Sequence, residues 1–137
     1  MLLAVSCTSA TACTAAGDRG DRVNDGELTL VMHWNGSSWS RQPTPNPTVT
    51  NSADIDPSGV SCTSSSACTA VGFDQQLIRT KPLAEAWDGT RWTIKAVRQP
   101  PYGSLQAVTC LAAADCTAIG DLYHVGPVTK TLAEQYS

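Results

Sequence analysis

The segments Val5-Ser6-Cys7 and Cys13-Thr14-Ala15-Ala16-Gly17 begin a pattern that occurs three times in this chain of 137 residues. The later copies read Val60-Ser61-Cys62 with Cys68-Thr69-Ala70-Val71-Gly72, and Val108-Thr109-Cys110 with Cys116-Thr117-Ala118-Ile119-Gly120. The same number of residues, five, separates the two cysteines in every copy. Repetition at a period of about 50 residues indicates a fold built from copies of one supersecondary unit.

A second landmark follows each cysteine pair and ends on an aromatic residue. The three versions are Leu30-Val31-Met32-His33-Trp34-Asn35-Gly36, Leu83-Ala84-Glu85-Ala86-Trp87-Asp88-Gly89 and Leu132-Ala133-Glu134-Gln135-Tyr136. The first two continue to a further tryptophan, Trp39 or Trp92, whereas the third copy stops at Ser137. We therefore interpret 1–137 as a single repeat domain with units at about 1–50, 51–101 and 102–137.

Each complete unit is predicted to form four short strands. The residues up to the first cysteine form one strand, and a five-residue loop returns the chain into a second strand that begins at the next cysteine. Asn35-Gly36 and Asp88-Gly89 provide the positive backbone angles of a tight turn between the third and fourth strands. Proline-rich connectors, Pro43–Pro47 and Pro100-Pro101, separate the units.

The expected fold is all-β, with three four-stranded antiparallel propeller-type blades of which the last is incomplete. A β-trefoil is the alternative, because three repeats of this length also suit a closed three-fold barrel. On the propeller interpretation, three blades cannot close a ring. We therefore expect the chain to self-associate, with two copies forming a six-bladed ring, or to join other blades of a larger propeller.

Composition excludes two classes of partner. Nine Lys and Arg residues are scattered among twelve Asp and Glu residues, giving a net charge of −3. Without a basic cluster, a nucleic-acid partner is not expected. The sequence also lacks the run of about 18 apolar residues that a membrane-spanning helix needs, so we expect no membrane partner.

The cysteine spacing predicts three local disulfides. The pairs are Cys7 with Cys13, Cys62 with Cys68, and Cys110 with Cys116. Zinc-binding and redox motifs place fewer residues between their cysteines, which leaves buried free thiols as the alternative. Disulfides imply an oxidising compartment, so we expect a secreted protein. Met1 to Cys7 has no basic, signal-like start, and we expect the chain to be a trimmed or processed form.

These repeats resemble those of secreted, disulfide-containing β-propeller-like proteins of actinobacteria. The resemblance rests on Val-Ser-Cys, Cys-Thr-Ala-Val-Gly and Leu-Ala-Glu-x-Trp-Asp-Gly-x-x-Trp, and it spans nearly the whole chain. The hairpin from Trp87 to Trp92 also resembles the corresponding hairpin of fucose-binding propeller lectins. That similarity implies sugar recognition by Arg, Glu and Trp side chains, although Glu85 lies one residue nearer to Trp87 than in the lectin motif.

The candidate ligand-binding residues are tryptophans and charged residues at repeated positions: Trp34, Trp39, Trp87, Trp92, Glu85, Glu134 and Arg91. Aromatic faces beside polar groups commonly hold sugars. The competing interpretation makes the tryptophans core residues between blades. It also leaves the carboxylates partly exposed beside an arginine such as Arg79 or Arg91.

We expect no enzyme activity, because the sequence contains no recognisable nucleophile-and-base pattern. His33 and His124 lie at non-equivalent positions of their units. The acidic loop from Asp18 to Asp25 lacks the ligand order of an EF-hand, so we expect neither a metal nor another cofactor. The predicted function is an extracellular module that binds carbohydrate or cell-envelope glycan. The alternative is a non-catalytic structural or protein-interaction propeller without a small ligand.

Overall fold

The computed structural model describes residues 1–23, 25–47, 53–97, 102–123 and 130–136. These residues form strands and turns only, as predicted, and none of them forms a helix able to cross a membrane. The strands are β1 (Leu2–Ser9), β2 (Ala12–Asp21), β3 (Gly26–Trp34), β4 (Trp39–Gln42), β5 (Asp54–Ser64), β6 (Ala67–Gln76), β7 (Arg79–Trp87), β8 (Trp92–Ile94), β9 (Gly103–Ala112), β10 (Asp115–Leu122) and β11 (Lys130–Tyr136).

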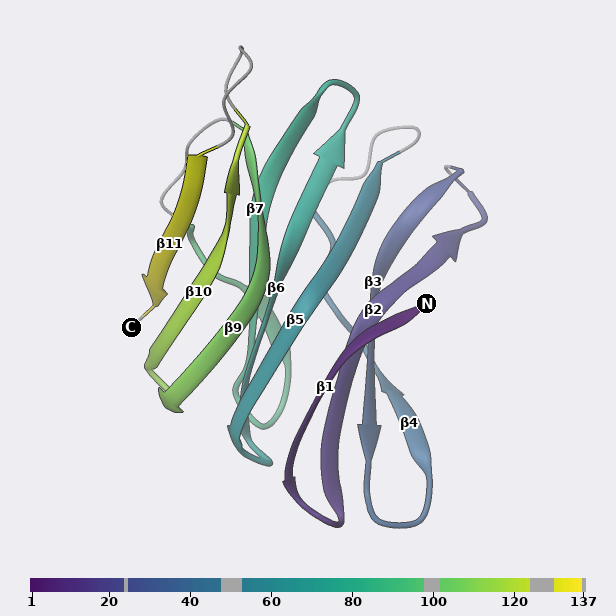
Figure 1. Cartoon of the computed structure of the whole chain (residues 1–137). Helices are drawn as coiled ribbons and strands as arrows, with labels where there is room; N and C mark the ends of the chain where they lie inside the picture. The colour runs from purple at the N-terminus through teal and green to yellow at the C-terminus, as the bar shows by residue number, and fades with distance from the viewer. Residues whose placement is uncertain (24, 48–52, 98–101, 124–129, 137) are drawn as a thin grey trace.

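Strands that follow one another in sequence pair antiparallel and make three meanders. The first meander is β1 to β4, the second is β5 to β8, and the third is β9 to β11. The first strand of each meander packs beside the first strand of the next, so β1, β5 and β9 succeed one another across the molecule (Figure 1). The sequence repeat is therefore a structural repeat.

The sheets do not divide into three separate four-stranded units as predicted. One parallel bridge joins Glu27 of β3 to Asp54 of β5, and the Glu27 N–H donates to the Ala53 carbonyl at 2.9 Å. This bridge merges the first two meanders into one eight-stranded sheet, while β11, β10 and β9 form a second sheet. Within the described residues, neither sheet closes into a ring or a barrel.

The cysteine hairpin is tighter than the predicted five-residue loop. Strand β1 continues past Cys7 to Ser9, and β2 begins at Ala12, so only two residues lie between the strands. A register shift between Cys7 and Ser9 allows Cys7 to lie directly opposite Cys13. The second and third hairpins repeat this geometry, and all three predicted disulfides are present.

The turn before each second tryptophan has the predicted positive backbone angle. Gly36 has a φ of 94° and Gly89 a φ of 95°, a conformation that side chains other than glycine rarely adopt. The Asn35 side-chain oxygen accepts the N–H groups of Ser37 and Ser38, at 2.9 and 3.0 Å. Asp88 holds the corresponding turn through the N–H groups of Thr90 and Arg91.

Two apolar clusters fill the junctions between meanders. At the first junction, Ala16 and Val31 of the first meander pack with residues of the second, including Val60 and Trp92. At the second junction, the cluster consists of Val71, Ala84, Leu105, Ala118 and Leu132, with other side chains around it. The connector Pro43–Pro47 contains no strand, as predicted, whereas Pro100 and Pro101 lie outside the described residues.

Close approach of the first strands limits side-chain size at the second junction. A Cβ placed on Gly59 would lie 3.1 Å from the Cα of Ala107. That distance is shorter than ordinary van der Waals contact, and the obstruction is backbone, which cannot rotate away. Small residues at these positions therefore let β5 and β9 pack together.

The structure predicts unequal contributions of the disulfides to stability. A bridge that closes so short a loop contributes about 2 kcal/mol in the chain-entropy model. Replacing Cys62 and Cys68 by alanine also disturbs a buried junction, because Cys68 is only 5% exposed. We expect C62A/C68A to lower the free energy of unfolding by more than C7A/C13A, measured by urea denaturation. Equal losses would contradict this ranking.

Candidate functional site

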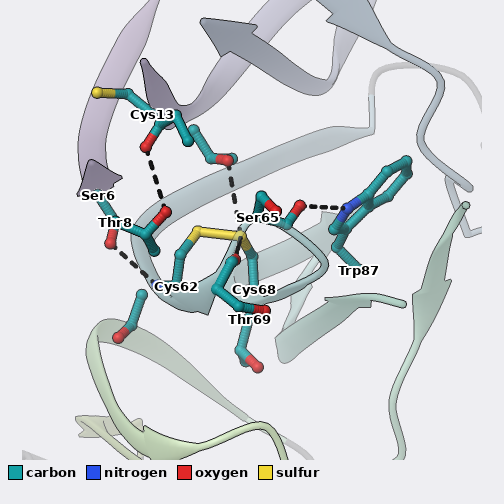
Figure 2. Close-up of a disulfide and its surroundings, with 12 residues drawn as sticks. Ser6, Thr8, Cys13, Cys62, Ser65, Cys68, Thr69 and Trp87 are labelled. Atoms are coloured by element: carbon teal, nitrogen blue, oxygen red, sulfur yellow. Dashed lines mark hydrogen bonds between the residues drawn. A yellow bond between two sulfur atoms is a disulfide. The ribbon is translucent and has the colours of Figure 1, made fainter. Parts of the chain in front are cut away.

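The four tryptophans form two equivalent pairs. The ring centres of Trp34 and Trp39 lie 5.7 Å apart, and those of Trp87 and Trp92 lie 5.9 Å apart, with tilted planes in both pairs. In each pair the first indole N–H donates to a carbonyl of the cysteine hairpin. Trp34 donates to Ala10 and Trp87 to Ser65, both at 3.2 Å. Figure 2 shows Trp87 directed at Ser65 beside the Cys62–Cys68 disulfide.

The second tryptophan of each pair differs in exposure. Trp92 is only 3% exposed, and its indole N–H donates to the side-chain oxygen of Gln42 in the first meander at 2.9 Å. Trp39 occupies the same position of the first meander and is 45% exposed. Trp92 therefore packs in the junction between meanders, as expected if the tryptophans are core residues between blades. Trp39 lies on the surface.

Glu85 is a buried carboxyl group. The alternative to ligand binding, a partly exposed carboxylate beside an arginine, is therefore wrong for this residue. Glu85 is 1% exposed, and neither side-chain oxygen has a hydrogen-bond partner among the described residues. Burial raises the pKa of Glu85 to about 8, so the group is neutral at pH 7. Arg91, one of the arginines expected beside Glu85, instead lies on the surface, where its Nε is 4.0 Å from Oδ2 of Asp88.

Glu134 is the one predicted ligand-binding residue that lines the cavity at the second junction. This cavity has a volume of about 900 Å³ and lies between the second and third meanders. Its lining combines small side chains with polar and aromatic ones: Thr69, Ala86, Lys95, Ala96, Ala113, Ala114, Cys116, Ala133, Glu134, Gln135 and Tyr136. The structure thus separates Glu134 from the tryptophans, Glu85 and Arg91, none of which contributes to this lining.

The cavity wall provides both donors and acceptors of hydrogen bonds. The hydroxyl oxygen of Tyr136 is buried and has no hydrogen-bond partner among the described residues. Burial, with a smaller contribution from Glu134, raises the pKa of Tyr136 well above its usual range, so the hydroxyl remains a donor. Lys95 and Gln135 line the cavity, are exposed, and offer an ammonium group and an amide.

The cavity-lining residues have packed counterparts at the first junction. At the first junction, Trp92 packs in a cluster with Cys68, contacts Trp87 and bonds to Gln42. The residues at the equivalent repeat positions all line the cavity: Cys116, Tyr136 and Lys95. Sequence analysis missed Lys95, although its repeat position, three residues after Trp92, matches that of Gln42.

The acidic loop contains an ordinary side-chain-capped turn. Asp21 accepts the Val23 N–H at 3.0 Å, while Asn24 lies outside the described residues, as does His124. Within the described ranges, no group of three or more His, Cys, Asp or Glu residues is arranged to hold a metal ion. The disulfides indicate that the protein resides in an oxidising environment.

No protein-family model matches this chain, and no curated protein matches it. The resemblance to propeller-like proteins thus depends on the repeat motifs alone.

The buried carboxyl predicts a specific pH dependence of stability. Since the pKa of Glu85 is raised from its ordinary 4.5 to about 8 in the fold, the folded state binds the proton more tightly. The contribution of Glu85 to stability is therefore fully present below pH 4.5 and is lost as the pH rises from 4.5 to 8. E85M introduces the residue found at the equivalent position, Met32, and we expect a gain on the order of 3 kcal/mol at pH 7.

Urea denaturation across this pH range measures the effect. In E85M, most of the decrease in the free energy of unfolding between pH 4.5 and 8 should be absent. Asp25→Asn, an exposed substitution in a turn, is the matched control and should keep that decline. A variant E85M with the same pH profile as the unmodified chain would show that Glu85 finds a partner in solution.

Proposed function

We propose that this chain is a secreted, non-catalytic, propeller-type module that binds a glycan in the cavity between its second and third meanders. On this proposal each meander is one blade, and the cavity lies between two blades. The observation that carries the proposal is the polar wall of the cavity, which Tyr136 shares with Glu134 and Lys95 and in which the Tyr136 hydroxyl has no hydrogen-bond partner among the described residues. Secretion accords with the three disulfides.

The blade interpretation is supported by the antiparallel order of the strands. Four consecutive strands pair as neighbours in each of the first two meanders, as in a propeller blade. The first strands β1, β5 and β9 also pack side by side, with small residues where they approach most closely. A propeller places the first strand of each blade in the same crowded position near its axis.

Glycan binding is supported by the chemistry of the cavity. A sugar ring presents hydroxyl groups that both donate and accept hydrogen bonds, together with an apolar face. Glu134 offers an acceptor, Lys95 a donor, and Tyr136 a ring with a donor hydroxyl. A volume of about 900 Å³ lies within the range of small-molecule sites.

The number of carboxylates that line this cavity supports a role in binding without catalysis. Glycoside hydrolysis generally uses two carboxyl groups on opposite sides of the scissile bond. Glu134 is the one carboxylate among the described residues that line the cavity. Glu85, its repeat equivalent, is buried at another junction and does not line the cavity.

An extended protein segment that contains tryptophan is the second candidate ligand. The observation in its favour is the set of neighbours of Trp92 at the first junction, Cys68, Trp87 and Gln42. Their repeat equivalents, Cys116, Tyr136 and Lys95, line the cavity, and Trp92 itself lies on a strand that pairs with β7. Such a segment would pair with Glu134 to Tyr136 along β11 and insert its indole into the cavity. This is the protein-interaction alternative.

A glycan array followed by isothermal titration calorimetry tests the proposed function. We expect binding of at least one class of glycan, and we expect E134Q to weaken it about tenfold or more, since a charged hydrogen bond is lost. Tyr136→Phe removes only the hydroxyl and should also weaken binding. Asp25→Asn removes a carboxylate that is not part of the cavity and should leave the affinity unchanged.

Binding that is insensitive to both cavity substitutions would place the ligand elsewhere. Absence of binding to every glycan, together with binding of a synthetic peptide spanning Asp88 to Lys95, would overturn the glycan proposal in favour of the protein segment. That peptide contains the chain's own Trp92 strand.

A further inference from the structure

Both junctions between meanders use the same pair of polar contacts. At the first junction the Cys62 N–H donates to the Ser6 hydroxyl at 2.9 Å, and at the second the Cys110 N–H donates to Ser61 at 3.0 Å. In Figure 2, Ser6 of the first meander reaches Cys62 of the second in this way. Ser6 and Ser61 occupy the same repeat position, and Thr109 occupies it in the third meander.

The second polar contact joins a threonine to a disulfide sulfur. The Thr14 hydroxyl lies 3.6 Å from the sulfur of Cys68, and the Thr69 hydroxyl lies 3.4 Å from that of Cys116. Thr117 occupies the equivalent position of the third meander. Every meander therefore has the residues of a front face, which contacts the next meander along the chain, and of a back face, which contacts the previous one.

Five repeat positions define the front face. They are Ala4, Ser6, Thr14, Ala16 and Val31 in the first meander; Gly59, Ser61, Thr69, Val71 and Ala84 in the second; and Ala107, Thr109, Thr117, Ile119 and Ala133 in the third. In the first two meanders all these residues are buried or partly buried, with Val71 and Ala84 at 0% exposure.

The front face of the third meander is uncovered. All five of its residues are exposed, and Ile119 is 55% exposed where its counterparts Ala16 and Val71 are fully buried. The two threonines that would make the polar contacts, Thr109 and Thr117, are exposed as well. Within the described chain, this apolar and hydroxyl-bearing surface faces solvent.

The back face of the first meander is uncovered in the same way. Val5 is 62% exposed, whereas its counterpart Val60 is 9% exposed. Trp39 is 45% exposed, whereas Trp92 is 3% exposed. Strand β1 is also an edge strand, and the pairing of Cys7 with Cys13 matches that of Cys62 with Cys68. The Cys7 N–H therefore points away from β2, as the Cys62 N–H points away from β6.

We propose that the front face of the third meander binds the back face of the first meander in a second copy of this chain. The two uncovered faces are the two halves of a contact that the chain makes twice within itself. The first meander of a second copy therefore already carries the back face that this contact needs. Its contact would bury Ile119 and Val5, which are among the exposed large apolar residues.

The expected contact has a defined register. The Cys7 N–H of one copy donates to the Thr109 hydroxyl of the other, and the Thr117 hydroxyl meets the Cys13 sulfur. This arrangement is head-to-tail, because the two copies contribute different surfaces. Repetition of such a contact produces either a closed ring or an open chain of copies. The proposal depends on the junctions alone and not on what occupies the cavity.

Sedimentation velocity on the purified chain tests this proposal. We expect the mass to rise above the 14.4 kDa of one copy with increasing concentration. Ile119→Lys and Val5→Lys should each prevent association, because each places a charge in the contact. Ile78→Lys is the matched control: Ile78 is 88% exposed in a turn outside both faces, and its replacement should not change association.

Mixing the two single variants tests the head-to-tail geometry. Ile119→Lys keeps an intact back face, and Val5→Lys keeps an intact front face. Equimolar mixing should give a complex of one copy of each, and no larger species. A symmetric contact between identical surfaces would not produce that result and would overturn the proposal, as would an unmodified chain that stays a single copy at all concentrations.

A conservative substitution guards against an effect on folding. Thr109→Val removes the hydroxyl acceptor while it keeps the side-chain shape and suits a strand. It should weaken association several-fold and leave the circular dichroism spectrum unchanged. Unchanged association would contradict the predicted bond from Cys7.

Discussion

The hydrogen bond from a cysteine N–H to a serine hydroxyl of the preceding meander is the interaction on which the arrangement of this protein depends. It occurs at Cys62 and at Cys110, and in both places a disulfide holds that cysteine directly opposite its partner. The disulfide fixes the hairpin, and the hairpin directs the cysteine N–H across the junction. Small residues such as Gly59 then let the first strands approach closely enough for the bond to form.

The same junction determines where binding surfaces arise. At the first junction the Trp92 indole and Gln42 complete the packing, and the carboxyl of Glu85 is enclosed. At the second junction the equivalent positions surround a cavity whose wall contains Tyr136 and Lys95. One repeated architecture therefore gives two junctions whose side chains differ at equivalent positions, with Trp87 and Gln42 at the first and Tyr136 and Lys95 at the second.

The repeat made much of the fold predictable from sequence, but not the environment of each copy. The cysteine spacing predicted the disulfides, and Gly36 and Gly89 predicted the turns. The sequence could not distinguish the roles of Trp39 and Trp92, because exposure depends on whether another meander covers the side chain. For the same reason it assigned Glu85 and Glu134 alike, although one is enclosed and the other lines the cavity. The bridge between Glu27 and Asp54 joins residues without a local sequence signal.

Amide hydrogen exchange at Cys7, Cys62 and Cys110, followed by nuclear magnetic resonance, tests the central role of the junction bond most directly. In a dilute sample we expect slow exchange at Cys62 and Cys110, whose N–H groups are bonded across junctions, and fast exchange at Cys7 on the uncovered edge. Exchange at Cys62 and Cys110 as fast as that at Cys7 would contradict it, because the junctions would then not be held by these bonds.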